Sequence, residues 1–143
     1  MTVKHILDIK GRDVTSIGAS ATIAQAAQLL TERKIGALVC LGEGRRILGI
    51  VSERDIVRAI AANGASALDR ALSDFMTREV TTCNEAMTVD EAMELMTRSR
   101  FRHLPVCEGG ELVGIISIGD AVKRRIEDVE READYMRTYI HAG

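Results

Sequence analysis

The stretch GIVSERDI, residues 49–56, returns 65 residues later as GIISIGDA, residues 114–121. Each copy is a short apolar run that breaks into a polar turn, and in both copies Ser and Asp stand three residues apart. Short apolar runs bounded by turn residues predict buried strands. A strand followed by a Ser-x-x-Asp turn therefore occurs twice, which indicates a duplicated structural unit.

The duplication extends through most of the chain. Shifted by 66 residues, TIAQAAQLLTERKIGALV from Thr22 aligns with TVDEAMELMTRSRFRHLP from Thr88. The offset falls to 65 after a glycine-rich turn, where a one-residue insertion costs little. Such an internal repeat predicts a fold built from two similar structural units.

Each copy predicts the same order of elements, β-α-β-β-α. Thr22 and Thr88 are good N-cap residues, and each is followed three positions later by a capping-box partner, Gln25 or Glu91. Apolar residues then recur at helical spacing before two short strands and a second helix. We expect an α+β fold in which the two repeats pack about a pseudo-twofold axis, because one copy alone buries too little apolar surface.

These patterns divide the chain into four parts. They are the first repeat, a connecting amphipathic helix, the second repeat and a C-terminal helical extension, at 1–64, 65–79, 80–128 and 129–143. The connecting helix is predicted from Leu68, Leu72, Phe75 and Met76 at helical spacing. The charged C-terminal helix, from residue 120 to about 139, fits either a solvated helix or a dimer contact.

The composition narrows the classes of function. Hydrophobic residues make up 46% of the chain, enough for a packed core. The net charge is −2, Trp is absent, and only two Phe and two Tyr occur. The lack of positive charge and of aromatic residues disfavours nucleic acid as a ligand. Cys40, Cys83 and Cys107 form no CxxC pair, so we expect reduced apolar thiols and no metal site. No signal peptide and no apolar run long enough to cross a membrane are recognised, which predicts a cytoplasmic protein.

No constellation of catalytic residues stands out. His5, His103 and His141 lie far apart, and no Ser or Cys nucleophile is paired with a base by a recognisable motif. We therefore expect no catalytic residues and a protein that is not an enzyme.

Two polar features suit a ligand, and each also has a structural explanation. Ser-x-x-Asp caps a helix, but its carboxylate can also accept the hydroxyls of a ribose. Arg100, Arg102 and His103 before the second copy's strand fit either a solvated basic edge or a site for phosphate oxygens. The residue types alone leave both alternatives open.

The motifs together resemble the cystathionine-β-synthase (CBS) domain family. MT at 76–77, T-V-x-E-A from Thr88, RHLPV from Arg102 and the repeated G-I-[IV]-S-x-x-D stand in the family's order. The resemblance covers about residues 3–128 as a tandem pair, and it implies a regulatory module that needs no cofactor and binds AMP, ADP, ATP, NAD(H) or S-adenosylmethionine. It also implies a homodimer that passes its ligand state to an unidentified effector protein. The composition, with no long apolar run and near-neutral charge, predicts no membrane partner and disfavours a nucleic-acid partner.

The family's binding residues transfer onto two clefts that each combine both repeats. The first cleft would use Ser52, Arg54, Asp55, Thr82, Ala86, Met87, Phe101, Arg102 and His103. The second cleft would use Ser16, Ala21, Ile35, Gly36, Ala37, Ser117 and Asp120.

The two clefts differ in charge. Gly119 replaces Arg54 in the second cleft, and Gly36 and Ala37 replace Arg102 and His103, so we expect the first cleft to bind phosphate more tightly. The main alternative is a dimeric scaffold whose clefts are vestigial. A nucleic-acid-associated protein using the basic run at 123–125 is a further alternative that the near-neutral charge disfavours.

Overall fold

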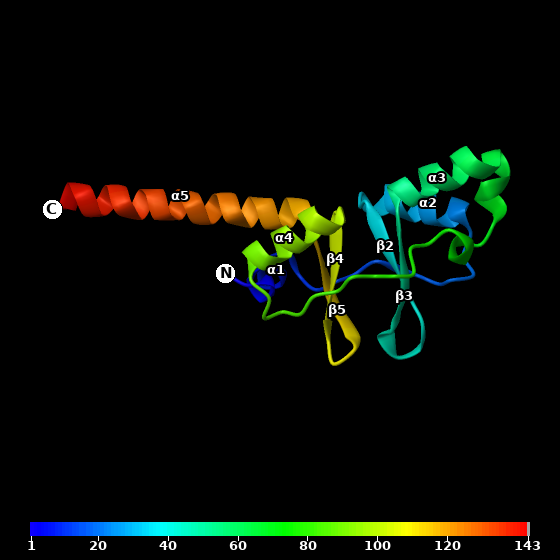
Figure 1. Cartoon of the computed structure of the whole chain (residues 1–143), viewed down its shortest axis with the longest axis horizontal. Helices are drawn as coiled ribbons and strands as arrows, with labels where there is room; N and C mark the ends of the chain where they lie inside the picture. The colour runs from blue at the N-terminus through cyan, green and yellow to red at the C-terminus, as the bar shows by residue number, and fades with distance from the viewer. Residues whose placement is uncertain (143) are drawn as a thin grey trace.

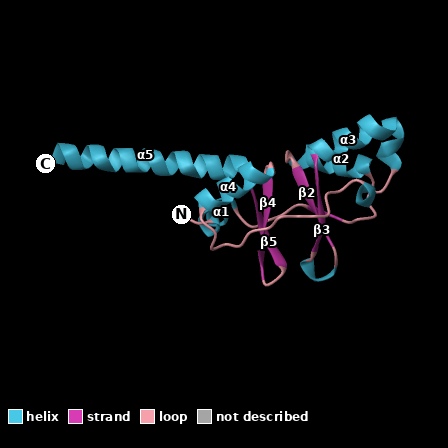
Figure 2. Cartoon of the chain, in the orientation of Figure 1, coloured by secondary structure: helices cyan, strands magenta, loops and turns pink. Residues whose placement is uncertain are grey.

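Two similar α+β halves lie side by side, and one long helix projects from the second half (Figures 1 and 2). The computed structural model describes residues 1–142. The α-helices are α1 (Val3–Lys10), α2 (Ile23–Arg33), α3 (Glu53–Asn63), α4 (Val89–Ser99) and α5 (Ile118–Ala142). The strands are β1 (Ser16–Ile17), β2 (Ala37–Leu41), β3 (Ile47–Ser52), β4 (His103–Glu108) and β5 (Glu111–Ser117), and the 3-10 helices are η1 (Glu43–Arg45), η2 (Gly64–Asp69) and η3 (Leu72–Asp74).

The sheets of the two repeats follow one plan. In the first repeat β2 pairs with β3 in antiparallel fashion and with the two-residue β1 in parallel. In the second repeat β4 and β5 form the matching antiparallel pair. A single parallel bridge from Cys83 to Val106 takes the place of β1, so the α+β repeat predicted from the sequence is confirmed in both halves.

The predicted helix starts are present. The side-chain oxygens of Thr22, Ser52 and Thr88 each accept a hydrogen bond from the backbone N–H three residues later. Glu91 differs from its expected role, because its carboxylate accepts a hydrogen bond from the Thr88 hydroxyl at 3.0 Å. Gly64 ends α3 with a φ of 70°, a conformation that a side chain disfavours.

The linker is not the connecting amphipathic helix that was predicted. Residues 64–74 instead form η2 and η3, and Leu72 and Met76 are buried in the core of the first repeat. The apolar residues do face one core, but they do so from two short 3-10 turns. Tertiary contacts therefore determine the backbone conformation here, over the helical periodicity of the sequence.

Helix α1 was not predicted, and it packs on the second repeat. Val3, Ile6 and Leu7 are buried with α4, β4 and β5 residues in the core of that repeat. The segment that opens the second repeat does the reverse. The Leu72 N–H donates to the Ala21 carbonyl at 2.8 Å, just as the Val3 N–H donates to the Met87 carbonyl at 2.8 Å, and the acceptors are 66 residues apart. Each repeat is therefore completed by the leading segment of the other.

Two glycines make this exchange of segments sterically feasible. A Cβ on Gly49 would lie 2.8 Å from the Thr77 carbonyl oxygen and 2.7 Å from the Met76 sulfur. A Cβ on Gly114, the matching position, would lie 2.7 Å from a methyl group of Leu7. The repeated glycine before the Ser-x-x-Asp turn thus leaves room for the incoming segment.

None of the helices formed by the described residues has both the length and the apolar character that crossing a membrane requires.

Candidate ligand cleft

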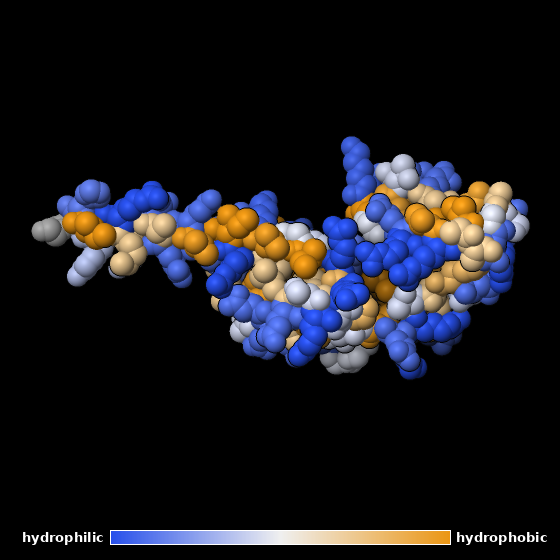
Figure 3. All heavy atoms as spheres, turned by 45° about the horizontal axis from the view of Figure 1, so that its top comes forward, coloured by the Kyte–Doolittle hydropathy of each residue, from blue (hydrophilic) through white to orange (hydrophobic). Residues whose placement is uncertain are grey.

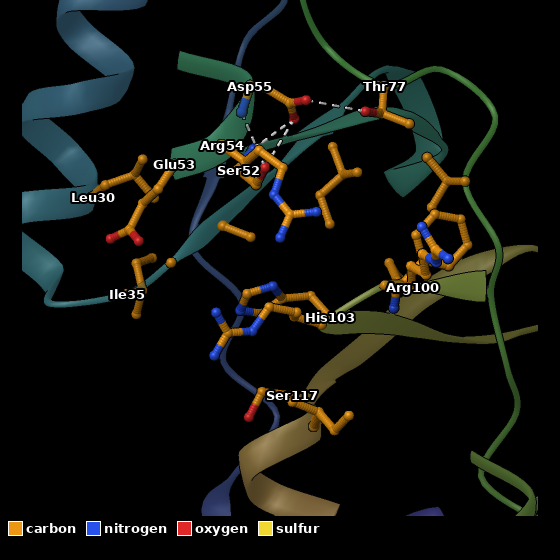
Figure 4. A pocket seen from close by; sticks show the side chains of 18 of the residues that line it. Leu30, Ile35, Ser52, Glu53, Arg54, Asp55, Thr77, Arg100, His103 and Ser117 are labelled. Atoms are coloured by element: carbon orange, nitrogen blue, oxygen red, sulfur yellow. Dashed lines mark hydrogen bonds between the residues drawn. The ribbon is translucent and has the colours of Figure 1, made fainter. Parts of the chain in front are cut away.

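A cleft of about 900 Å³ lies between the two repeats, where the strand ends and the helix N-termini of both halves meet (Figure 4). We refer to it as the central cleft. From the first repeat and the linker it is lined by Leu30, Thr31, Lys34, Ile35, Gly36, Ala37, Ile50, Ser52, Glu53, Arg54, Asp55, Arg58, Thr77, Glu79, Val80 and Thr81. From the second repeat it is lined by Ser99, Arg100, Phe101, Arg102, His103, Pro105, Ser117, Ile118 and Gly119.

The first Ser-x-x-Asp motif presents its carboxylate to the central cleft. One oxygen of Asp55, Oδ2, accepts hydrogen bonds from the Ser52 N–H at 2.9 Å and the Ser52 hydroxyl at 3.1 Å. The other oxygen, Oδ1, has only a long contact of 3.5 Å with the Thr77 hydroxyl (Figure 4). Capping therefore uses one oxygen of Asp55 and leaves the second for a ligand, so the capping and binding roles are compatible.

The second motif is paired with a lysine from α1. Asp120 Oδ2 accepts the Ser117 N–H at 2.8 Å and the Lys10 ammonium at 2.7 Å. Lys10 also donates to the Ile115 carbonyl at 3.0 Å, and Asp120 does not line the central cleft. Partial burial raises the pKa of Asp120, but the hydrogen bonds from Lys10 and Ser117 outweigh it and hold the pKa below its ordinary value. The two motifs thus have similar sequences, but only the second has its Asp carboxylate paired with a lysine.

Cations outnumber acids in the lining of the central cleft. The five cations are Lys34, Arg54, Arg58, Arg100 and Arg102, against the three acids Glu53, Asp55 and Glu79. Within residues 1–142 the side chains of these cations form no ion pair and donate no hydrogen bond. Unpaired guanidinium groups around a concave site are suited to bind phosphate oxygens.

Two of these cations occupy equivalent and unusual backbone positions. Lys34 ends α2 with a φ of 55°, and Arg100 ends α4 with a φ of 59°. The left-handed region is a common way for a helix to end, although glycine is the usual residue there and other residues adopt it at an energetic cost. In both repeats the cost places a basic side chain at the rim of the central cleft.

His103 stands where the two repeats meet. A Cβ on Gly36 would lie 3.3 Å from its ring, so the first repeat approaches the imidazole closely at a residue without a side chain. In Figure 4, Arg54 from one repeat and His103 from the other point into the same space. Burial and the neighbouring Arg102 lower the pKa of His103, which favours the neutral imidazole at pH 7.

The structure brings together most of the residues assigned to the first cleft. Ser52, Arg54, Asp55, Phe101, Arg102 and His103 line the central cleft, and so do Ile35, Gly36, Ala37 and Ser117 from the set assigned to the second cleft. Thr82, Ala86, Met87, Ser16, Ala21 and Asp120 lie outside the lining. Thr82 and Ala86 are exposed elsewhere, and Met87 packs against the second core.

Several lining residues were not assigned from the sequence. Thr77 lies in the linker, which was expected to be helical up to residue 79, and Val80 and Thr81 follow it in an extended stretch at the start of the second repeat. Arg58 lies one helical turn after Arg54 on α3, and this spacing could have indicated it. Lys10 was missed with α1, although Val3, Ile6 and Leu7 show the spacing of a helix face.

Comparison with known proteins agrees with this geometry. The family model for the CBS domain matches residues 3–62 and 72–127. The crystal structure of the CBS-domain containing protein ATU1752 from Agrobacterium tumefaciens is similar, with 49% identity, a TM-score of 0.85, and coverage of 87% of this chain and 99% of that one. The CBS domain pair of MJ0100, solved with 5′-methylthioadenosine and S-adenosyl-L-methionine, is 26% identical with a TM-score of 0.77, covering 90% of this chain and 97% of that one.

A curated relative extends the similarity over the whole chain. The mitochondrial CBS domain-containing protein CBSX3 of Arabidopsis thaliana is 31% identical over 99% of this chain and 73% of its own length. The two family matches coincide with the two structural repeats, and the central cleft lies between them. The chain belongs to the CBS-domain family and carries a tandem pair of CBS domains.

Proposed function

We propose that this chain is a regulatory CBS pair that binds one adenosine phosphate in the part of the central cleft around Asp55. The observation that carries the proposal is that Asp55 Oδ1, whose single contact is the long one of 3.5 Å with Thr77, shares the lining of one cleft with five cations that form no ion pair within residues 1–142. A carboxylate oxygen of this kind can accept ribose hydroxyls, and the cations can bind the phosphates.

The adenosine part of the ligand is supported by a relative. The MJ0100 pair was solved with two adenosine derivatives, and this chain shares its fold at 26% identity. In the central cleft, Ile50, Val80 and Ile118 offer apolar surface beside the Ser-x-x-Asp motif, which suits a purine ring.

The charge of the cleft favours a phosphate over a sulfonium. S-adenosylmethionine carries a positive sulfonium, whereas five cations against three acids already make this lining positive. AMP, ADP and ATP gain charge-assisted hydrogen bonds worth roughly 1.5–3 kcal/mol each from arginine. We therefore rank AMP, ADP or ATP above S-adenosylmethionine, with NAD(H) as a ligand that carries the same adenosine phosphate unit.

Isothermal titration calorimetry tests the proposal with AMP, ATP, NADH and S-adenosylmethionine. We expect one nucleotide per chain, with AMP or ATP bound at least tenfold more tightly than S-adenosylmethionine. Arg102→Ala and Asp55→Asn should each weaken AMP binding about tenfold, which corresponds to roughly 1.4 kcal/mol. Arg98→Ala is the matched control, because Arg98 is exposed on α4 and does not line the cleft.

The alternative is a dimeric scaffold with vestigial clefts. It predicts no heat of binding and no thermal stabilisation by millimolar nucleotide, and this outcome would overturn the proposal. We place the regulatory output in a partner protein or in self-assembly, with no reaction on the bound nucleotide. Recovery of unchanged nucleotide after incubation would support that assignment, and product formation would contradict it.

A further inference from the structure

The projecting helix α5 carries an exposed apolar stripe along one face. Orange side chains run along the helix in Figure 3, well beyond the body of the protein. The stripe consists of Val122, Ile126, Val129, Ala133, Met136 and Ile140, and its large members are between 39% and 68% exposed. An apolar stripe this exposed on a charged helix is unusual for a solvated surface, which suggests that it is covered by another molecule.

The spacing of the stripe is that of a coiled coil. The intervals between its members alternate between four and three residues from Val122 to Ile140. In heptad terms Ile126, Ala133 and Ile140 occupy a positions, and Val122, Val129 and Met136 occupy d positions. Isoleucine at a favours two strands when leucine occupies d; here valine and methionine occupy d, so sedimentation must establish the number of strands.

The body of the protein uses a different face of α5. Ala121 and Arg124 are buried, and Arg125 forms an ion pair with Asp90 of α4 at 2.8 Å. A groove shared with Met1 and the N-terminus of α4 is lined from α5 by Arg125, Asp128, Arg131, Glu132, Tyr135 and Met136. Apart from Met136, which borders this groove and is still 55% exposed, the a and d stripe therefore lies on a side of the helix that the chain's own body leaves uncovered.

The charges beside the stripe identify the occupant and its direction. In a parallel, in-register pair each g residue meets the e residue of the partner's next heptad. Arg125 at g would then meet the partner's Glu130, and Glu132 at g would meet the partner's Arg137. Both pairs are attractive and each occurs twice by symmetry. In the antiparallel pair centred on the same stripe, Glu132 would meet the partner's Glu132 and Lys123 would meet the partner's Arg137, which are both repulsive.

We propose that α5 pairs with α5 of a second copy of this chain as a parallel, in-register two-stranded coiled coil. Parallel pairing places the second repeat next to the second repeat of the partner and makes the dimer head-to-head. The stripe from Val122 to Ile140 spans about 27 Å at 1.5 Å per residue. This proposal is independent of what the central cleft binds.

Sedimentation equilibrium across a range of concentrations tests whether the stripe makes a dimer. We expect the wild type to be dimeric and Ile126→Asp to be monomeric. Ile9→Asp is the matched control, since Ile9 is an isoleucine that is 70% exposed on α1 and lies outside the stripe. A wild type that stays monomeric, or an Ile126→Asp variant that stays dimeric, overturns the proposal. Nucleotide titration of each variant is a separate readout that dimer loss need not change.

Two variants test the direction of pairing. Arg137→Glu faces the partner's Glu132 in the parallel pair and should raise the dimer dissociation constant about fivefold. In the antiparallel pair it would face the partner's Lys123 and lower that constant, which would refute the parallel arrangement. Arg131→Glu makes the same charge change at an f position and serves as the control.

Cross-linking gives a second and independent measure of direction. Ile140→Cys should form an interchain disulfide under mild oxidation, because parallel pairing brings the two 140 positions together. Antiparallel pairing places them on opposite ends of the stripe, too far apart to react. Thr138→Cys, at an f position away from the stripe, should not cross-link, and its efficient cross-linking would argue for random collision.

Discussion

Replacing Lys10 with methionine should open a second nucleotide site. Lys10 binds Asp120 Oδ2 at 2.7 Å, the same oxygen that accepts the Ser117 N–H, so its ammonium competes with a ligand hydroxyl for this carboxylate. Methionine keeps much of the apolar length of the side chain and removes the charge. The variant thus separates the closing of the second site from the packing of α1.

The expected magnitude follows from the geometry of this ion pair. A charge-assisted hydrogen bond contributes roughly 1.5–3 kcal/mol when it is well buried. The Lys10 and Asp120 side chains are 35% and 28% exposed, so solvent screening reduces the contribution to about 1 kcal/mol or slightly more. Lys10→Met should therefore raise affinity at the second site by about five- to tenfold.

Calorimetry measures this directly through the number of nucleotides bound per chain. We expect one AMP in the wild type and a second, weaker AMP in Lys10→Met. Lys4→Met is the matched control, because Lys4 pairs with Asp8 on the same helix at 2.9 Å and lies away from the cleft. Two equal sites in the wild type, or an unchanged single site in Lys10→Met, would show that Lys10 does not govern the second motif.

The same variant has a pH signature. The folded state holds the pKa of Asp120 below its ordinary value, so this carboxylate stabilises the fold at neutral pH. That stability is present above the unfolded pKa and is lost as the pH falls through the folded pKa. The free energy of unfolding of Lys10→Met should lie below that of the wild type at pH 7, and the gap should shrink in acid.

Two further predictions concern stability. Gly49→Ala should destabilise the fold by about 1–3 kcal/mol and more than Gly114→Ala, because its Cβ would meet the Thr77 backbone carbonyl at 2.8 Å, whereas the Cβ of Gly114 would meet the side-chain methyl groups of Leu7. Urea unfolding measures both losses, and equal losses would contradict this reasoning. Burial lowers the pKa of His103 in the folded state, so the unfolded chain binds a proton at this residue more readily. The free energy of unfolding is therefore unaffected by His103 above its ordinary pKa of 6.5 and decreases as the pH falls below that value. His103→Gln, which cannot titrate in this range, should flatten the loss of stability between pH 7 and pH 5, and an unchanged slope would rule out His103 as its source.

The repeated architecture could be predicted from the sequence because each helix start and strand is encoded by neighbouring residues and occurs in both copies. Thr22, Ser52 and Thr88 marked helix starts by side-chain chemistry that depends on three or four neighbouring residues. A single copy leaves the position of the turn between the two strands ambiguous, and the alignment of the two copies resolves it.

The linker and α1 could not be predicted in the same way. Their backbones depend on which repeat they contact, and that contact is made across the pseudo-twofold axis. Periodicity showed apolar residues near Leu72 but did not show which core would receive them. The closing of the second motif was hidden for the same reason, since Lys10 and Asp120 are 110 positions apart in the chain.

The central cleft was therefore predicted in part. Residues that share a motif with Asp55 or precede β4 were identified, because the family resemblance supplied their positions. The lining contributed by Thr77 depends on an extended linker end, which the helical interpretation of residues 65–79 excluded, whereas Thr81 follows that segment and was not assigned.

The reciprocal placement of α1 and the segment around Leu72 has a consequence for how the chain can be divided. A cut between Gly64 and Leu72 would leave each fragment without the segment that completes its own core and with a segment that fits only the other fragment. Separated fragments would be driven to reassociate, and two copies of a single repeat could satisfy one another by trading their leading arms. Gene duplication and fusion would turn such an arm-exchanged pair into one polypeptide, and the covalent link would make the exchange intramolecular and independent of protein concentration.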